Sequence, residues 1–299
     1  MAALGHGCTG SGGGIRDTLC LPLEGPERVS ATVLVGTQGW NYPAWVGGFY
    51  PVGTRRGDWL RVYARAFRTV EVDATFYAVP AEPIVRGWGE RVPSGFLFSL
   101  KVPQEITHER RLVDCGEVLA RFCRRAAVLG DALGPLLLQL SPDFKPAQAT
   151  FGLLAEFLGS LPAQFRWAVE FRHPGWLTHR SIDLLGSRNV ALVLADSRWI
   201  GRGLVLDLAL EPTADFGYAR WVGPNRRITD YSRVQVDRDY EIALWARALE
   251  SLSQRVRTIF GYFNNHFQGH APHSARTLQR QLGQEPVEPV ALQEQAELF

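Results

Sequence analysis

Eight short apolar runs recur along the chain, and segments with helical periodicity separate most of them. The runs lie at 33–35, 69–73, 96–101, 136–140, 166–170, 190–195, 216–220 and 257–263. Their apolar residues are nearly continuous rather than alternating, which is typical of parallel strands covered on both faces. Between the runs, apolar residues at helical spacing predict helices, most clearly at 117–129 and 240–252.

This alternation predicts an α/β fold, either a closed (β/α)8 barrel or an open doubly wound sheet. The count of eight favours a single TIM-type barrel over residues 31–283, with irregular long loops at the C-terminal face. No Gly-x-Gly-x-x-Gly turn follows the first run, which argues against a dinucleotide fold. The connection 197–215 lacks a clear helical pattern. Residues 1–30 are interpreted as a disordered or mis-called extension, and 284–299 as a flexible tail.

Composition narrows the class of protein but not its function. The chain has 299 residues, 46% of them hydrophobic, and a net charge of +2, so charge alone does not indicate a nucleic-acid partner. No apolar stretch approaches the roughly 18 residues of a membrane helix, and four cysteines lack metal-site spacing. A cytoplasmic location with no membrane partner is therefore expected. Lys101 and Lys145 are the only lysines in an arginine-rich chain.

Charged and amide residues follow the predicted strands in series. They are Glu71, Asp73, Lys101, Gln139, Glu170, Arg172, Asp196, Arg220, Asn264 and Asn265. The carboxyl ends of parallel barrel strands meet at one face, where barrel enzymes keep their chemistry. The series therefore predicts a pocket, although an ion-pair network that closes the barrel top would place the same residues there.

Blocks of sequence at these strand ends resemble one family, the YecE-like domain of unknown function numbered 72. The blocks lie at 35–40, 49–51, 70–77, 101–103, 107–108, 170–176, 195–196 and 262–265. The resemblance extends from about residue 33 to 283 and implies a TIM-type barrel without a settled activity. One departure follows the seventh strand, where the family often has Arg-x-His-Gly and this chain has Arg-Trp-Val-Gly from Arg220.

The leading hypothesis is a hydrolase-type enzyme acting on a phosphate-containing substrate such as DNA or RNA. Glu170 is assigned as the acid–base residue, with Glu71 and Asp196 as further catalytic carboxylates. Cations at the strand ends would hold the phosphate and aromatic residues would stack on a base or sugar. The expected substrate-binding residues are Asp73, Lys101, His108, Gln139, Arg172, Arg220, Asn264, Asn265, Trp40, Tyr42 and Tyr77.

Two alternatives remain open. A carbohydrate-active hydrolase would use Glu170 with Glu71 or Asp196 across a glycosidic bond. A non-catalytic nucleic-acid or sliding-clamp-associated module would bind without turnover. Basic pairs in the predicted loops, at 55–56, 110–111 and 226–227, would form a positive rim if they shared one face. The aromatic residues at 40–50 are mostly interpreted as a loop that packs its own small core.

A metal site is considered and not expected. His266, His270 and His273 have the spacing of one helix face, but Gly269 and Pro272 indicate a loop. Zinc would also require further ligands from a defined set. No cofactor is therefore predicted.

The last five residues, Gln-Ala-Glu-Leu-Phe, suggest a protein partner. They resemble the peptide that bacterial replication and repair proteins insert into the sliding clamp. Gln295, Leu298 and Phe299 would be the anchoring residues, after a segment that contains Pro286 and Pro289. A tail that packs on its own barrel is the alternative.

Overall fold

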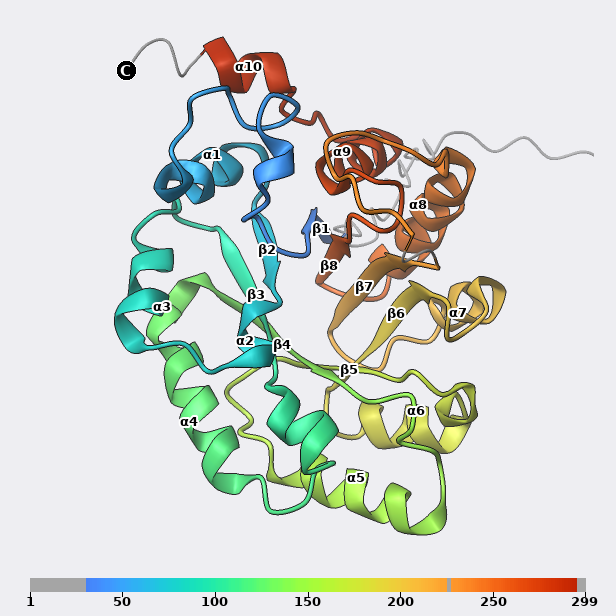
Figure 1. The fold of residues 1–299 in the computed structure, drawn as a ribbon. Helices are drawn as coiled ribbons and strands as arrows, with labels where there is room; N and C mark the ends of the chain where they lie inside the picture. Colours follow the sequence, from blue (N-terminus) through green and yellow to red (C-terminus); the bar gives the residue numbers. More distant parts are fainter. Residues whose placement is uncertain (1–30, 225–226, 295–299) are drawn as a thin grey trace, which may run out of the picture.

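Eight parallel strands form a barrel in the computed structural model, which describes residues 31–224 and 227–294 (Figure 1). The strands are β1 (Thr32–Thr37), β2 (Thr69–Val72), β3 (Leu97–Lys101), β4 (Leu133–Gln139), β5 (Trp167–Glu170), β6 (Ala191–Ser197), β7 (Phe216–Gly223) and β8 (Thr258–Phe263). Their hydrogen-bonded order is β1-β8-β7-β6-β5-β4-β3-β2. Every pair in this order is parallel, so all strands end at one face of the barrel.

Helices surround the strands (Figure 1). They are α1 (Trp59–Ala66), α2 (Ala74–Tyr77), α3 (Glu82–Gly89), α4 (Gly116–Ala126), α5 (Gln148–Ser160), α6 (His179–Gly186), α7 (Arg202–Leu208), α8 (Asp239–Ser253), α9 (Ala271–Gln281) and α10 (Pro289–Glu294). Their buried faces follow the helical repeat: in α8, Ile242, Trp245 and Leu249 are fully buried. Burial of such faces against the strands produces the two-layer barrel.

The barrel closes between β1 and β2 through side chains and one isolated backbone bridge. Gly36 permits the close approach of the two strands, because a Cβ there would lie 2.2 Å from the carbonyl oxygen of Thr69. The hydroxyl of Tyr63, from α1, donates to the same Thr69 oxygen at 3.0 Å and accepts from the Thr37 N–H at 2.9 Å. One tyrosine thus takes the place of ladder hydrogen bonds at this seam.

Apolar and aromatic side chains fill the barrel interior. They are Leu34, Leu137, Ala168, Ala191, Val193, Ala195, Phe216, Tyr218, Phe260 and Tyr262. The Tyr262 hydroxyl lies 2.7 Å from Thr69 Oγ1 and 2.6 Å from Ser99 Oγ, which links β8 to β2 and β3 across the interior. A packed interior of this kind leaves chemistry to the open face of the barrel.

Residues 284–294 continue the fold beyond α9, although the sequence analysis assigned them to a flexible tail. The Gln284 side chain donates to the carbonyl of Val33 in β1 at 2.9 Å. Leu292 in α10 is fully buried, and α10 contacts α1. This segment therefore packs on the outside of the barrel against β1 and α1.

The eight-stranded TIM-type barrel predicted from the sequence is confirmed, with two local differences. The connection 197–215 contains the short helix α7, whose Val205 is buried. Helix α9 begins at Ala271, so Pro272, interpreted from the sequence as part of a loop, lies in the first turn of a helix, where proline fits. Among the described residues, no helix has both the length and the apolar character needed to cross a membrane.

Candidate functional site

A polar cavity of about 600 Å³ opens at the carboxyl ends of the strands. Its walls include residues at or after the end of every strand, from Gln38 after β1 to Asn264 after β8. The cavity brings together many of the side chains expected to bind substrate. Those that line it are Asp73, Tyr77, Lys101, His108, Gln139, Arg172, Arg220 and Asn264.

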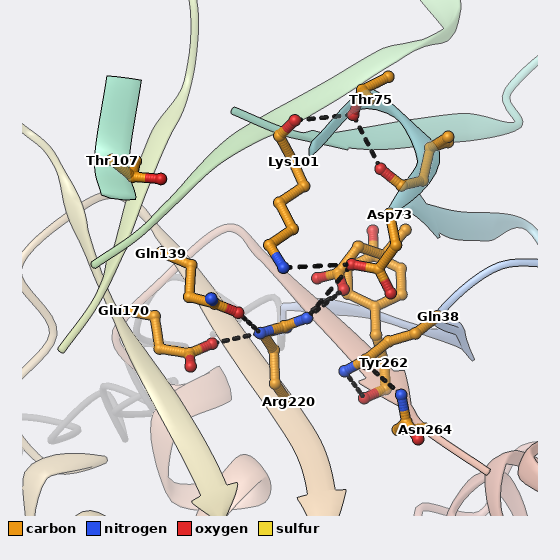
Figure 2. Close-up of polar contacts among 12 residues, drawn as sticks. Gln38, Asp73, Thr75, Lys101, Thr107, Gln139, Glu170, Arg220, Tyr262 and Asn264 are labelled. Carbon is orange, nitrogen blue, oxygen red and sulfur yellow. Dashed lines mark hydrogen bonds and ion pairs between the residues drawn. The ribbon is translucent and has the colours of Figure 1, made fainter. Parts of the chain in front are cut away.

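Arg220 forms the floor of this cavity and is only 2% exposed (Figure 2). Its Nε and Nη2 donate to Glu71 Oε1 at 3.1 and 2.7 Å. Its Nη1 donates to Gln139 Oε1 at 3.1 Å and also to Glu170 Oε2. Both carboxylates are fully buried. A single guanidinium, with its planar set of donors, thus joins β2, β4 and β5 beneath the cavity.

The two buried carboxylates differ in their affinity for protons. Burial raises the pKa of Glu71, and the opposing effects of Arg220 and the Tyr218 hydroxyl do not cancel it. Burial alone would also raise the pKa of Glu170, but Arg220 and Arg172 outweigh it and lower the value to about 2. Glu170 is therefore a carboxylate anion at neutral pH, which does not fit a general acid that must carry a proton.

The three carboxylates expected to be catalytic are buried and paired. Glu71 and Glu170 lie beneath the cavity on the guanidinium of Arg220. Asp196 accepts from Arg202 Nε at 2.6 Å and from Trp245 Nε1 at 2.8 Å. Asp196 does not contribute to the cavity wall. Proton transfer requires the carboxylate to reach the substrate, so these positions instead fit a role in holding the barrel mouth together.

Arg172 extends the same network toward the cavity. Its Nε donates to Glu170 Oε1 at 2.8 Å, and its Nη2 donates to Gln139 Oε1 at 2.6 Å. The Gln139 oxygen therefore accepts from two guanidinium groups, those of Arg172 and Arg220. The anionic Glu170 and this shared acceptor hold two like-charged arginines side by side.

Lys101, the last residue of β3, places an amine in the cavity wall (Figure 2). Its Nζ lies 3.8 Å from Asp73 Oδ1 and 3.8 Å from the centroid of the Phe76 ring. The Thr75 hydroxyl donates to the Lys101 carbonyl at 2.7 Å, which fixes the turn after β2 to the end of β3. Burial lowers the pKa of Lys101; Asp73 opposes this effect and Arg220 reinforces it.

Asp73 is the carboxylate that faces the cavity. Among the described residues that line it, Asp73 is the one acidic side chain, and it is 32% exposed. Its Oδ1 lies 3.6 Å from Arg220 Nη2 and accepts no hydrogen bond within the described residues. This oxygen is itself buried, so a ligand in the cavity would contact the exposed remainder of the Asp73 side chain.

His108 lines the cavity from a π-helical turn, η3 (Glu105–Glu109). Its Nδ1 lies 2.8 Å from the Thr107 hydroxyl, and its ring meets the Phe76 ring edge-on. Burial lowers its pKa to about 4, with Lys101 and Arg172 adding to the effect. The imidazole is therefore neutral at neutral pH and offers a hydrogen bond without adding charge.

The aromatic loop after β1 divides into two parts. Trp45, Phe49 and Tyr50 are fully buried and form the small core expected of this loop. Trp40 and Tyr42 line a second, smaller cavity of about 360 Å³, of which Asp73 is also a wall residue. These two aromatic side chains therefore adjoin the main cavity but do not line it.

The adjacent asparagines after β8 have different surroundings. Asn264 lines the cavity, and its Nδ2 donates to Gln38 Oε1 at 2.8 Å (Figure 2). Asn265 is buried, and its Oδ1 accepts from Trp45 Nε1 at 3.1 Å and from the Ala271 N–H at 2.9 Å. Asn265 thus ties the aromatic loop to the start of α9 rather than facing the cavity.

Several cavity residues were not anticipated from the sequence. Phe76 lies within α2, and Arg198 and Trp199 follow the end of β6. A signal was present, since each of these residues lies within a few positions of a predicted strand end.

The three histidines considered for a metal lie near the start of α9. His270 is buried, and its Nδ1 lies 2.8 Å from the carbonyl of Tyr231. His266 precedes the helix and His273 lies within its first turn. Across the part of the chain that the structure describes, no group of three or more His, Cys, Asp or Glu side chains could hold a metal ion.

Two predictions concern the ends of the chain, which lie outside the described residues. They concern the extension at 1–30 and the clamp-binding residues Gln295, Leu298 and Phe299. The clamp hypothesis therefore continues to depend on the sequence.

A parallel barrel with ionisable side chains gathered at the carboxyl ends of its strands defines a TIM-type barrel protein with a candidate ligand-binding pocket. The model of a family described as "Protein of unknown function DUF72" matches residues 34–297. The chain belongs to this family, which confirms the resemblance seen at the strand ends.

Known relatives support this assignment. "UPF0759 protein YecE" of Escherichia coli strain K12 is 33% identical over 172 residues, which span 56% of this chain and only 60% of that relative. "UPF0759 protein YunF" of Bacillus subtilis strain 168 is 23% identical over 269 residues, covering 82% and 93% of the two chains. The crystal structure of a DUF72 family protein from Thermotoga maritima is similar with a TM-score of 0.73 and 25% identity, over 85% of this chain and 100% of that one.

Proposed function

We propose that the chain is an enzyme of the hydrolase type that acts on a small phosphate-bearing substrate in the cavity at the barrel mouth. The charge of the cavity wall carries this proposal. Lys101, Arg172 and Arg198 line the wall, whereas Asp73 is the one carboxylate among its described residues. Cations grouped in a concave, partly desolvated site attract an anionic group and stabilise negative charge that develops there.

Asp73 is the proposed acid–base residue, in place of Glu170. The Asp73 side chain lines the cavity and is 32% exposed, whereas its Oδ1 is buried near Lys101 Nζ and Arg220 Nη2. The anionic Glu170 is instead held by Arg172 and Arg220 beneath the cavity. A carboxylate facing the cavity can take a proton from an attacking water and return it to a leaving group.

The size of the cavity favours a small molecule over a polymer. About 600 Å³ lies within the roughly 300–1,000 Å³ typical of small-molecule sites. The basic residues expected to form a nucleic-acid rim are partly neutralised, since Arg55 pairs with Asp58 at 3.2 Å and Arg110 with Glu105 at 2.9 Å. A small phosphate ester is therefore proposed, and an oligonucleotide becomes a competing ligand in the test.

The carbohydrate alternative has less support from the geometry. A glycosidase needs two carboxylates on opposite sides of the scissile bond. Glu71 and Glu170 are both fully buried, and both are hydrogen-bonded to Arg220. Neither side chain contributes to the cavity wall. Neutral sugars consequently serve as negative controls.

Thermal unfolding with added ligands would test the proposal. The panel contains inorganic phosphate, small phosphate monoesters, matched neutral sugars and short single-stranded and duplex DNA, each over a salt series. We expect the phosphate compounds to raise the unfolding temperature and the neutral sugars to have no effect. The matched variants are Arg172→Gln in the cavity and Arg124→Gln on the exposed surface of α4.

The outcomes separate the hypotheses. Stabilisation by phosphate esters that is lost in Arg172→Gln and kept in Arg124→Gln supports a phosphate site in the cavity. Release of inorganic phosphate from a stabilising ester would then establish turnover. Stabilisation by DNA alone, falling steeply with salt, would indicate a non-catalytic nucleic-acid module. Stabilisation by neutral sugars alone would move the function to carbohydrates.

A further inference from the structure

Lys101 is the cavity residue whose position the proposed phosphate site does not fully explain. Its side chain is only 10% exposed, whereas Arg172 already offers a cation at the same wall. Arginine provides a more suitable fork of donors for a phosphate, and 30 of the 32 basic residues are arginines. A lysine at this position supplies something that arginine lacks, which is a nitrogen that can lose its proton and act as a nucleophile.

Two features of the surroundings make it easier for Nζ to lose its proton, although the Phe76 ring, at 3.8 Å from centroid to nitrogen, attracts the charged form. The first is burial, since the side chain is only 10% exposed and water has little access to it. The second is Arg220, which lies close by and opposes a further positive charge. Asp73 is the one counter-charge within 4 Å among the described residues. Desolvation and a neighbouring cation are the conditions that activate amine nucleophiles in enzymes.

Asp73 is also placed to move the protons that amine chemistry requires. Its Oδ1 lies 3.8 Å from Lys101 Nζ, a gap that a small side-chain rotation closes. That oxygen accepts no hydrogen bond within the described residues. The pair therefore combines a nucleophile and an acid–base group on one wall of the cavity.

We propose that Lys101 is a covalent catalytic residue, whose Nζ condenses with a carbonyl group of the bound substrate to form a Schiff base. The Lys101 ammonium first gives a proton to the Asp73 carboxylate. The neutral amine then adds to the carbonyl carbon, and a proton passes from nitrogen to oxygen to give a carbinolamine. Asp73 then returns its proton to the carbinolamine hydroxyl, which leaves as water. The overall reaction converts the ammonium group and the carbonyl group into an iminium ion and one water molecule.

This chemistry narrows the substrate class. It requires an aldehyde or ketone that also carries a phosphate or carboxylate, because Arg172 and Arg198 line the same cavity. An iminium withdraws electrons from the bonds next to the former carbonyl carbon. The bond broken would therefore be one adjacent to that carbon. The inference rests on the proposed function only for the binding of the anionic group of the substrate. It replaces hydrolysis of the phosphate ester by cleavage of a bond next to the former carbonyl carbon, which releases no inorganic phosphate.

Reductive trapping tests the Schiff base directly. The full chain is incubated with glycolaldehyde phosphate, dihydroxyacetone phosphate or glyoxylate and then reduced with borohydride. Peptide mass spectrometry locates the adduct. The chain offers an internal control, since Lys145 is the only other lysine and is exposed. We expect modification of Lys101 to exceed that of Lys145 by about tenfold or more, because the neutral amine is the reactive form.

Two matched variants complete the test. Lys145→Arg should retain the adduct and Lys101→Arg should lose it, while Asp73→Asn should slow its formation with Lys101 still present. Inorganic phosphate should compete with the phosphorylated probes. Equal labelling of both lysines, or no labelling of Lys101 with any probe, would overturn the Schiff base. If phosphate esters still stabilised the fold in that case, the proposed phosphate site would stand and only the role of Lys101 would fail.

Discussion

The guanidinium of Arg220 donates two hydrogen bonds to one oxygen of Glu71, from Nε at 3.1 Å and from Nη2 at 2.7 Å. Both side chains are essentially inaccessible to water. Buried ion pairs gain little over apolar packing, but loss of one partner leaves a charge stranded in a medium of low polarity. The pair therefore makes the floor of the cavity sensitive to single substitutions.

Arg220→Met should destabilise the fold strongly. It leaves Glu71 and Glu170 buried without their shared cation, which costs about 3–5 kcal/mol. Urea unfolding followed by circular dichroism measures the change. The double variant Arg220→Met with Glu71→Gln should recover part of the loss, and Arg124→Met on the exposed face of α4 should cause almost none. Unchanged stability in Arg220→Met would show that the network does not hold the barrel mouth.

Asp73→Asn should mainly reduce turnover, whereas Glu170→Gln should mainly reduce stability. Asp73→Asn removes the proposed acid–base group and should reduce turnover by about 10²–10⁴-fold with little change in stability. Glu170→Gln weakens the contacts to Arg172 and Arg220 and should mainly lower the free energy of unfolding. Steady-state kinetics on the substrate from the ligand panel, paired with urea unfolding, distinguishes the two. An active Asp73→Asn and a stable, inactive Glu170→Gln would return the acid–base role to Glu170.

His108 should make the fold less stable as the pH falls. Its pKa is about 4 in the folded chain and about 6.5 when unfolded. Between these values the unfolded chain binds the extra proton, so stability is present above about pH 6.5 and declines as the pH approaches 4. His108→Gln should flatten this decline, and His179→Gln, at an exposed position, should not. An NMR titration of His108 with a midpoint near 6.5 would contradict the assignment.

Gly36→Ala should disrupt the seam between β1 and β2. The new Cβ would lie 2.2 Å from the carbonyl oxygen of Thr69 and 3.0 Å from the Tyr63 hydroxyl, and the first contact is with backbone. We expect a loss of several kcal/mol, about 2–5, by analogy with other overpacked core positions. Gly152→Ala is the matched control. It lies within α5 with open space around it, so it should stabilise the fold by up to about 1 kcal/mol.

The C-terminal pentapeptide should bind a bacterial sliding clamp if the sequence resemblance reflects function. Fluorescence polarisation of a labelled peptide spanning 295–299 measures this with purified clamp. Leu298→Ala and Phe299→Ala should each abolish binding, because short anchors depend on a few apolar side chains. No change in polarisation at high micromolar clamp would remove the clamp as a partner.

The sequence predicted the barrel and the convergence of its polar strand ends, because parallel strands of one barrel share a direction. It did not predict which of these side chains face the cavity. Glu71 lies within β2, whereas Asp73 follows the end of that strand and begins the turn into α2. These two positions separate a carboxylate paired beneath the cavity from one in its wall. Apolar patterning cannot resolve so small a difference.

The placement of Asp196 shows a second reason. Its carboxylate accepts hydrogen bonds from Arg202 in α7 and from Trp245 in α8, which lie 6 and 49 positions away in the sequence. Because no helix was expected after β6, the sequence did not indicate that Arg202 would pair with Asp196. Side-chain pairing between separate helices depends on their packing, which periodicity alone does not specify.

The contacts of Gln284 and Leu292 determine where this chain can be shortened. A truncated chain ending at residue 283, the end of the barrel suggested by the sequence, would leave the Val33 carbonyl without its donor and would expose the surface that α10 covers. A cut after residue 294 removes the clamp-like pentapeptide and keeps both contacts. Loss of clamp binding could then be distinguished from damage to the barrel.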